Sequence, residues 1–140
     1  MIKIVCFGRR NEGWVEEVIR EYGKRMTKYW RVEWQITDEK NEEKIVQSLN
    51  DYFLVVLDEQ GKSLSSEEFS GVLAGKIREG RRVCLIIGGA YGVSEVTRGR
   101  ADVVLSLSRM VFAHQLCRAI LAEQVYRAQE IAAGGPYHHG

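Results

Sequence analysis

The sequence predicts an α/β fold in which helices cover both faces of a mostly parallel sheet. Three apolar runs predict strands that are buried on both faces: Ile2–Phe7, Phe53–Leu57 and Val83–Ile87. Such runs are typical of parallel strands between two helix layers. Segments with helical periodicity separate them. The length of 140 residues suits one hydrophobic core, so we expect residues 1–140 to form a single domain.

The first third of the chain alternates between strand and helix patterns. After the strand 2–7 stops at Gly8, apolar residues recur at helical spacing: Trp14, Val18, Tyr22 and Met26. This stripe predicts a helix over about 13–29. Apolar and polar residues then alternate over 32–36, which predicts a half-exposed strand. Asp38 can cap a short helix that follows it.

The middle of the chain holds the second buried strand and a well-marked helix. The strand 53–57 is followed by the polar segment 58–62, which we expect to be a loop. Ser65 and Glu68 then have the spacing of a capping box. The pattern predicts a helix from this box to a stop near Gly80.

The last part of the chain contains two strands and the longest helix. The strand 83–87 ends at the glycine-rich segment 88–92, and Ser94 can cap a short helix. A strand over 103–107 and a loop over 108–112 come next. A long helix is predicted over about 113–133, where Gly134 and Gly135 end it before the tail 136–140.

Three loops are expected to meet at one edge of the sheet. In open parallel sheets, ligands bind beyond the carboxyl ends of the strands. That rule brings together Leu57–Lys62, Gly88–Gly92 and Leu107–Phe112. The glycine-rich segment has two interpretations at this point, a cradle for a ligand or a turn that requires positive φ.

Composition excludes several classes of protein. No apolar run is long enough to cross a bilayer, and the first residues lack the basic region and cleavage site of a secretory signal. The three cysteines, Cys6, Cys84 and Cys117, are widely spaced among apolar neighbours, as buried thiols of a reducing compartment are. His114 and Cys117 have no second ligand pair with zinc spacing. We expect a cytoplasmic protein without a membrane or metal partner.

The net charge of +1 conceals three blocks of charge. Residues 1–31 carry eight Lys or Arg against four Glu, residues 32–75 carry three against ten acids, and residues 76–140 carry nine against five. Eight of the last nine cations are Arg, whose planar guanidinium suits phosphate. A basic face for RNA or a nucleotide is one interpretation, and solvated helix faces with pairs such as Glu123 and Arg127 are the other.

Several blocks of the sequence, taken in order, resemble one known family. They are Leu57–Lys62, Leu85–Gly92, Ser106–Ser108, His114, the helix from Arg118 through Ala128, and Pro136–His138. In these blocks the chain resembles the RlmH family of SPOUT methyltransferases. The likeness spans essentially the whole chain and is strongest from Leu57 onward.

The resemblance implies a function and a fold that periodicity does not. Members methylate N3 of a pseudouridine in helix 69 of 23S rRNA, in the large ribosomal subunit, and act as homodimers. They bind S-adenosyl-L-methionine in a C-terminal trefoil knot, which here would span about 53–140. Cofactor-binding residues carried across are Leu57, Gly89, Leu107, Ser108, Arg109, Met110, Val111 and Phe112.

The resemblance also implies residues for substrate binding and catalysis. Tyr137 would stack on the flipped-out base, and His138 is the candidate base or anion stabiliser at N3. Substrate-binding residues carried across are Arg109, Arg118, Tyr137, His138 and His139.

The chain departs from the family pattern at three places. Ala90 and Tyr91 stand where the glycine loop usually has Pro-Glu, and Ala113-His114-Gln115 replaces Pro-His-Pro. His139 takes the place of Arg or Lys in the tail. Two alternatives therefore stay open: a knotted methyltransferase acting on another RNA base or a ribose 2′-hydroxyl, and a non-catalytic RNA- or ligand-binding α/β module.

Overall fold

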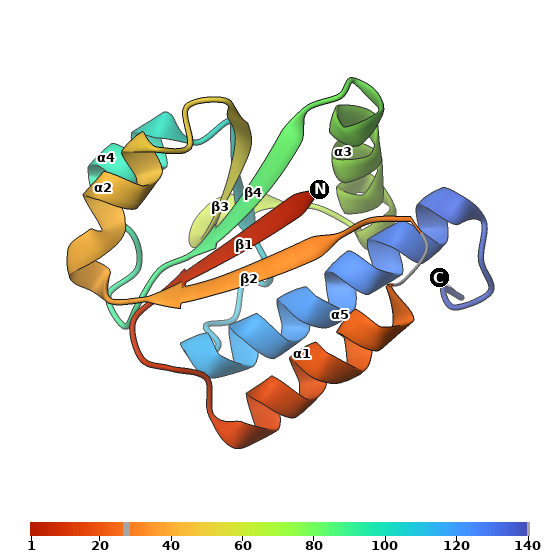
Figure 1. Ribbon diagram of the computed structural model, residues 1–140, viewed down its shortest axis with the longest axis horizontal. Coiled ribbons are helices and arrows are strands. Elements are labelled where there is room, and N and C mark those ends of the chain that lie inside the picture. The colour runs from red at the N-terminus through yellow and green to blue at the C-terminus, as the bar shows by residue number, and fades with distance from the viewer. Residues whose placement is uncertain (27–28, 140) are drawn as a thin grey trace.

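The computed structural model describes residues 1–26 and 29–139, and these form a five-stranded parallel sheet covered by helices (Figure 1). The strand order is β2-β1-β4-β3-β5, and each neighbouring pair is parallel. The strands are β1 (Ile2–Phe7), β2 (Val32–Thr37), β3 (Tyr52–Ser63), β4 (Arg82–Ile87) and β5 (Val103–Ser106). The predicted α/β class with a parallel sheet is confirmed.

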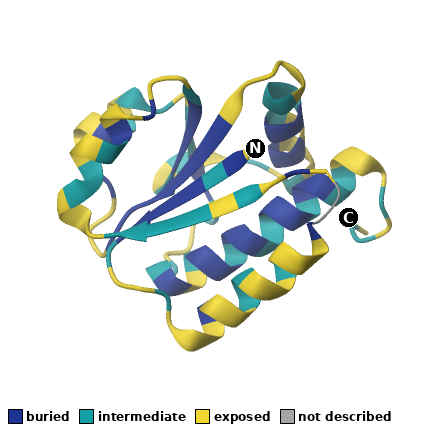
Figure 2. Ribbon diagram, in the orientation of Figure 1, coloured by how far each residue is buried: buried dark blue, intermediate teal, exposed yellow. Residues whose placement is uncertain are grey.

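Helices cover both faces of the sheet, as Figure 1 shows. One layer contains α1 (Gly13–Arg25), α3 (Ser66–Arg78) and α5 (His114–Ala133). The other contains α2 (Glu42–Gln47), preceded by the 3₁₀ turn Glu39–Asn41, and α4 (Glu95–Arg100). Because successive side chains of a strand point to opposite faces, β1 places Ile4 in the first core and Val5 in the second. Figure 2 shows the central strands buried and the outer sides of α1 and α2 exposed.

The helix starts and stops follow the capping residues expected from the sequence. Ser65 accepts a hydrogen bond from the Glu68 N–H at 3.0 Å, and the Glu68 carboxylate accepts one from the Ser65 N–H at 2.8 Å. Ser94 accepts from the Thr97 N–H at 3.2 Å, so it caps α4. Gly134 ends α5 in the left-handed region with φ of 71°.

The first helix is shorter than predicted. The structure ends α1 at Arg25 rather than near Tyr29, and residues 27–28 of the expected helix lie outside the described residues. Met26 and Trp30 are 9% and 8% exposed and belong to the core beneath α1. At Met26 the backbone leaves helical geometry, with φ of −94° and ψ of 44°, and its N–H donates to the Gly23 carbonyl at 3.2 Å, three residues earlier, which ends the helix.

The polar segment 58–62 is strand rather than the loop that the sequence predicts. β3 continues to Ser63, and Leu57 and Lys62 both face Leu105 of β5, so the strand bulges between them. A side chain at Gly61 would place its Cβ 2.6 Å from the Val104 carbonyl oxygen. Backbone pairing with β5 therefore decides the conformation here, against the polar composition.

Candidate functional site

One cavity lies at the edge where the parallel strands end. It has a volume of about 640 Å³, within the usual range for small-molecule sites. Its walls come from segments 57–60, 87–92 and 107–114, without Arg109, together with Arg98 and Cys117. The structure thus brings together the three segments that the strand-end rule had placed around one site.

The glycine-rich wall of the cavity is a tight backbone turn. The Gly92 N–H donates to the Gly89 carbonyl at 3.0 Å, and Gly92 has φ of 78°. A Cβ on Gly88 would lie 2.4 Å from the Gly92 carbonyl carbon. A Cβ on Gly89 would instead meet the Glu39 carboxylate, also at 2.4 Å. The positive φ of Gly92 confirms the turn interpretation, and residues 88–92 of this turn line the cavity.

A carboxylate is held at the rim of the cavity. Asp58 is 9% exposed and accepts hydrogen bonds from Arg98 Nη2 at 2.6 Å and from the Gln60 N–H at 2.8 Å. Burial alone would raise the pKa of Asp58, but these two donors outweigh it and lower that pKa below its ordinary value. The charged oxygens can accept hydrogen bonds from hydroxyl or amino groups of a ligand. Asp58 lies in a segment that the sequence placed at the site, but sequence reasoning missed Arg98 and its pairing with Asp58, because that pair joins β3 to α4.

The loop after β5 and the start of α5 form the opposite wall. Ser108 Oγ accepts from the Met110 N–H at 2.9 Å, and the Ser108 carbonyl accepts from Ser106 Oγ at 2.8 Å. These bonds hold the loop in a conformation in which its apolar residues Met110, Val111 and Phe112 line the cavity. Met110 and Val111 are nevertheless 73% and 76% exposed. Arg109 is exposed and is not part of the wall.

Most of the residues predicted to bind the cofactor do line this cavity. They are Leu57, Gly89, Leu107, Ser108, Met110, Val111 and Phe112. His114 and Cys117 of α5 line it as well, although neither is among the predicted cofactor residues. Burial raises the pKa of the Cys117 thiol.

The tail lies away from the cavity of its own chain. The Tyr137 hydroxyl donates to Glu123 Oε2 at 2.7 Å, and its ring packs edge-on against Tyr126 with centroids 4.7 Å apart. Glu123 is six residues beyond Cys117 on α5, or about 9 Å along the helix axis. Burial, followed by the bonds to Tyr22 and Glu123, raises the pKa of Tyr137, so the phenol is neutral at physiological pH.

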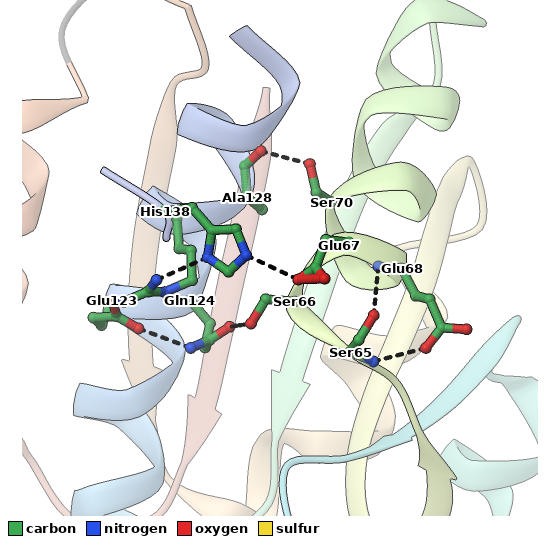
Figure 3. Close-up of polar contacts among 10 residues, drawn as sticks. Ser65, Ser66, Glu67, Glu68, Ser70, Glu123, Gln124, Ala128 and His138 are labelled. Carbon is green, nitrogen blue, oxygen red and sulfur yellow. Dashed lines mark hydrogen bonds and ion pairs between the residues drawn. The ribbon is translucent and has the colours of Figure 1, made fainter. Parts of the chain in front are cut away.

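The imidazole of His138 is fixed between two helices. Its Nδ1 lies 2.9 Å from Arg127 Nη1, and its Nε2 lies 2.9 Å from Glu67 Oε1 at the start of α3 (Figure 3). Arg127 also forms the predicted ion pair with Glu123, at 2.7 Å. His139 is exposed.

Arg118 is fully buried, whereas the resemblance suggested an RNA contact. Its Nη1 donates to the Arg9 carbonyl at 2.8 Å and to Asn11 Oδ1 at 2.9 Å. Nε and Nη2 are buried and have no partner in the described part of the chain. In this position the guanidinium is covered from any phosphate at the surface.

Within residues 1–26 and 29–139, no three His, Cys, Asp or Glu side chains gather in a way that could hold a metal ion. Among the same residues, none of the helices has the length and apolar character needed to span a bilayer.

Comparison with known sequences gives consistent matches over nearly the whole chain. A family model described as "Predicted SPOUT methyltransferase" matches residues 1–138. The chain is 38% identical to ribosomal RNA large subunit methyltransferase H of Clostridium botulinum strain Langeland, covering 98% of each chain. It is 34% identical to the protein of the same name from Caldicellulosiruptor saccharolyticus, covering 99% of each.

Solved structures share the fold at low sequence identity. A probable methylase family protein from Haemophilus influenzae Rd KW20 has a TM-score of 0.63 at 10% identity, covering 99% of this chain and 70% of that one. The SpoU methyltransferase AviRb from Streptomyces viridochromogenes, solved in complex with the cofactor AdoMet, has a TM-score of 0.56 at 13% identity. That match covers 96% of this chain and 58% of AviRb.

Proposed function

The chain belongs to the SPOUT methyltransferase family, and from that premise we propose that it uses S-adenosylmethionine to methylate 23S rRNA of the large ribosomal subunit. The proposed target is N3 of a pseudouridine in helix 69. The observation that carries the proposal is the cavity that three strand-end segments form together, in a chain whose relatives are named ribosomal RNA large subunit methyltransferase H.

The residues around the cavity fit S-adenosylmethionine. Apolar side chains of Leu57, Leu107 and Phe112 can enclose an adenine ring, and the glycine turn at 88–92 leaves the main chain open to a ligand. Asp58 can accept hydrogen bonds from ribose hydroxyls or from the amino group. When bound, this cofactor supplies an electrophilic methyl group on a sulfonium. The protein's task is to align the nucleophile with that methyl group, so orientation is its main contribution to the rate.

Tyr137 and His138 are the proposed substrate residues. The neutral phenol ring of Tyr137 can stack on the target base. The imidazole of His138 can accept the proton of the pseudouridine N3 imide or stabilise the anion that remains. N3 is nucleophilic only after it loses this proton. The reaction therefore needs a base close to N3 in addition to the cofactor site.

A homodimer is proposed because the tail and the cavity of one chain lie apart. In a two-fold dimer, the tail of one protomer can serve the cavity of its partner. Large apolar side chains of the rim loops are exposed: Tyr91, Met110 and Val111. Val96 of α4 and Leu116 of α5 are exposed as well. The apolar side of α5 is buried against α1 and α3 within one chain, so it cannot also form the interface. We therefore place the interface on Leu116 and the rim loops.

The remaining parts of the proposal follow from the same family. Residues 1–140 form one SPOUT domain with a trefoil knot over about 53–140. Arg109 and His139, both exposed, contact RNA phosphates, and the protein works in the cytoplasm, where ribosomes are.

Three measurements test the proposal. Calorimetry should show S-adenosylmethionine binding at one site per chain, and the absence of binding would refute the cofactor. Single-turnover methyl transfer to unmodified large subunits or ribosomes, with mass mapping of the product, should place the methyl group on the helix 69 pseudouridine. A methyl group on another base or on a ribose would support the alternative knotted methyltransferases. Light scattering that shows an active monomer at micromolar concentration would refute the dimer.

A further inference from the structure

Two adjacent arginines lie in the loop between β1 and α1, next to the proposed site. Arg9 and Arg10 are both exposed. In the part of the chain that the structure describes, neither guanidinium forms an ion pair. They carry two of the eight positive charges of residues 1–31.

The backbone of this loop is held by two buried side chains of α5. Arg118 donates to the Arg9 carbonyl at 2.8 Å, and Gln115 Nε2 donates to the Arg10 carbonyl at 3.1 Å. Gln115 Oε1 also accepts from the Glu12 N–H at 3.0 Å. Arg118 is fully buried and Gln115 is 7% exposed. These bonds are shielded from water and fix the main chain that carries the two arginines.

The same turns of α5 line the cavity. With 3.6 residues per turn, His114 and Cys117 face the cavity while Gln115 and Arg118 occupy the neighbouring side, toward the loop. The loop also touches the glycine turn, because a Cβ on Gly8 would lie 3.5 Å from the Gly89 Cα. Figure 1 shows the chain leaving β1 beside the first turn of α5.

Three carboxylates lie near the loop, those of Glu12, Glu16 and Glu39, and none forms an ion pair with Arg9 or Arg10 in the described part of the chain. Glu39 Oε1 would lie 3.8 Å from a Cβ on Gly8. The carboxylate of Glu12 accepts from Trp14 Nε1 at 2.9 Å, and that of Glu16 accepts from Asn11 Nδ2 at 3.0 Å. Arg118 keeps two buried nitrogens without a partner. Such burial is costly, so the position of Arg118 is not explained by stability alone.

We propose that Arg9 and Arg10 contact RNA phosphates beside the target nucleotide, with Gln115 and Arg118 as positioning residues. This inference rests on the proposed rRNA methyltransferase function and adds a second RNA contact to it. In the strand order, β1 and β5 flank β4 and β3, so the loop after β1 and the Arg109 loop after β5 border the cavity from opposite sides. The RNA backbone crosses the cavity between these two loops.

The test removes both charges and compares the result with a matched pair elsewhere. The variant is Arg9→Gln with Arg10→Gln, and the control is Arg78→Gln with Arg81→Gln. The control arginines are also exposed but lie at the edge where the strands begin. The probe is a labelled helix 69 hairpin titrated at several salt concentrations. S-adenosylmethionine affinity and melting temperature are measured on the same samples.

We expect the Arg9 and Arg10 variant to bind the hairpin at least tenfold more weakly at low salt. The slope of log affinity against log salt should fall by about 1.5, since each phosphate contact contributes about 0.7 to 0.9. Cofactor affinity should be unchanged. If the Arg9 and Arg10 variant binds RNA as tightly as the control variant, the inference is overturned. Methylation of the subunit by the wild-type protein would still support the proposed function in that case. A wild-type protein that methylates no large-subunit RNA would overturn the proposed function itself.

A second variant tests the positioning role. Gln115→Ala keeps both arginines but frees the Arg10 carbonyl and the Glu12 N–H. We expect KM for the RNA to rise about fivefold or more, with kcat and cofactor affinity retained. Loss of kcat and cofactor affinity together, with KM unchanged, would show that Gln115 only supports the cavity wall and would overturn its positioning role.

Discussion

His138 Nδ1 accepts a hydrogen bond from Arg127 Nη1 across 2.9 Å. A guanidinium has no acceptor, so this ring nitrogen carries no proton. The proton of the neutral ring is then on Nε2, which donates to Glu67 Oε1 at 2.9 Å. The contact therefore fixes the orientation and the tautomer of His138 in this arrangement, and Arg127 must leave Nδ1 before that nitrogen can accept the N3 proton.

His138→Ala should abolish or strongly reduce methyl transfer, because it removes the group that accepts the N3 proton. We expect a loss of at least 100-fold in the single-turnover rate, the lower range for general base catalysis. His139→Ala is the comparison variant: that imidazole is exposed and adjacent, and because we place it on a phosphate rather than at N3, its loss should reduce the rate less. Equal losses in both variants would contradict the assignment of His138.

Deletion of residues 136–140 should abolish methylation while S-adenosylmethionine binding persists, because no described residue of the tail lines the cavity. The melting temperature should also fall by several degrees. Tyr137 packs against Tyr126 and donates to Glu123, so the deletion removes packing as well as chemistry. Differential scanning calorimetry checks the stability, and calorimetric titration checks the cofactor. Full methylation by the truncated protein would show that the tail is inert.

Gly88→Ala should weaken S-adenosylmethionine binding more than Gly89→Ala does. The new Cβ at Gly88 would meet main-chain atoms of Gly92, which cannot move without opening the turn. The Cβ at Gly89 would meet the end of the Glu39 side chain, which can rotate away. We expect at least a tenfold rise in cofactor Kd for Gly88→Ala, or about 1.4 kcal/mol. The reverse order of affinities would contradict this geometry of the turn.

Asp58→Asn should destabilise the protein at pH 7 but not in acid. The pKa of Asp58 is lower in the folded protein than its ordinary value. Its contribution to the free energy of unfolding is therefore complete above the ordinary pKa and disappears as the pH falls through the lowered one. Urea unfolding should show a loss of about 1.5 kcal/mol at pH 7, typical of hydrogen bonds to a charged group.

The control for that experiment is Asp51→Asn. Asp51 lies 3.7 Å from Arg82, and its side chain is 85% exposed, so its loss should leave stability unchanged within error. If Asp58→Asn lowers the free energy of unfolding as much at pH 3 as at pH 7, the ion pair with Arg98 is not the cause of the loss.

The three thiols should differ in reactivity. Burial raises the pKa of Cys6 and of Cys84 to about 12, so neither is a thiolate at pH 8. Cys117 is partly exposed and lines the cavity. Ellman's reagent should therefore modify one thiol per native chain, and saturating S-adenosylmethionine should slow that reaction at least fivefold. Cys117→Ser should remove it. Fast modification of two thiols in the native protein would contradict the burial of Cys6 and Cys84.

The sequence by itself determined the fold class, the helix caps and the place of the cavity. Buried strands have apolar residues on both faces, and a cap such as Ser65 with Glu68 is a local hydrogen-bond pattern. Both signals depend on residues close together in the chain. Parallel strands then bring their carboxyl ends to one edge, which places Leu57, Gly89 and Leu107 together without any further information.

Only the tertiary structure decided the contacts between distant segments. It made 58–62 a bulged strand, because β5 supplies the backbone partners. It joined Asp58 to Arg98, and it buried Arg118 against the Arg9 carbonyl 109 residues away in sequence. It also docked the tail on Glu123 and Glu67, away from the cavity of its own chain. These outcomes depend on which side chains the packed elements bring within hydrogen-bond distance. The periodicity of a short segment does not indicate which distant residues those are.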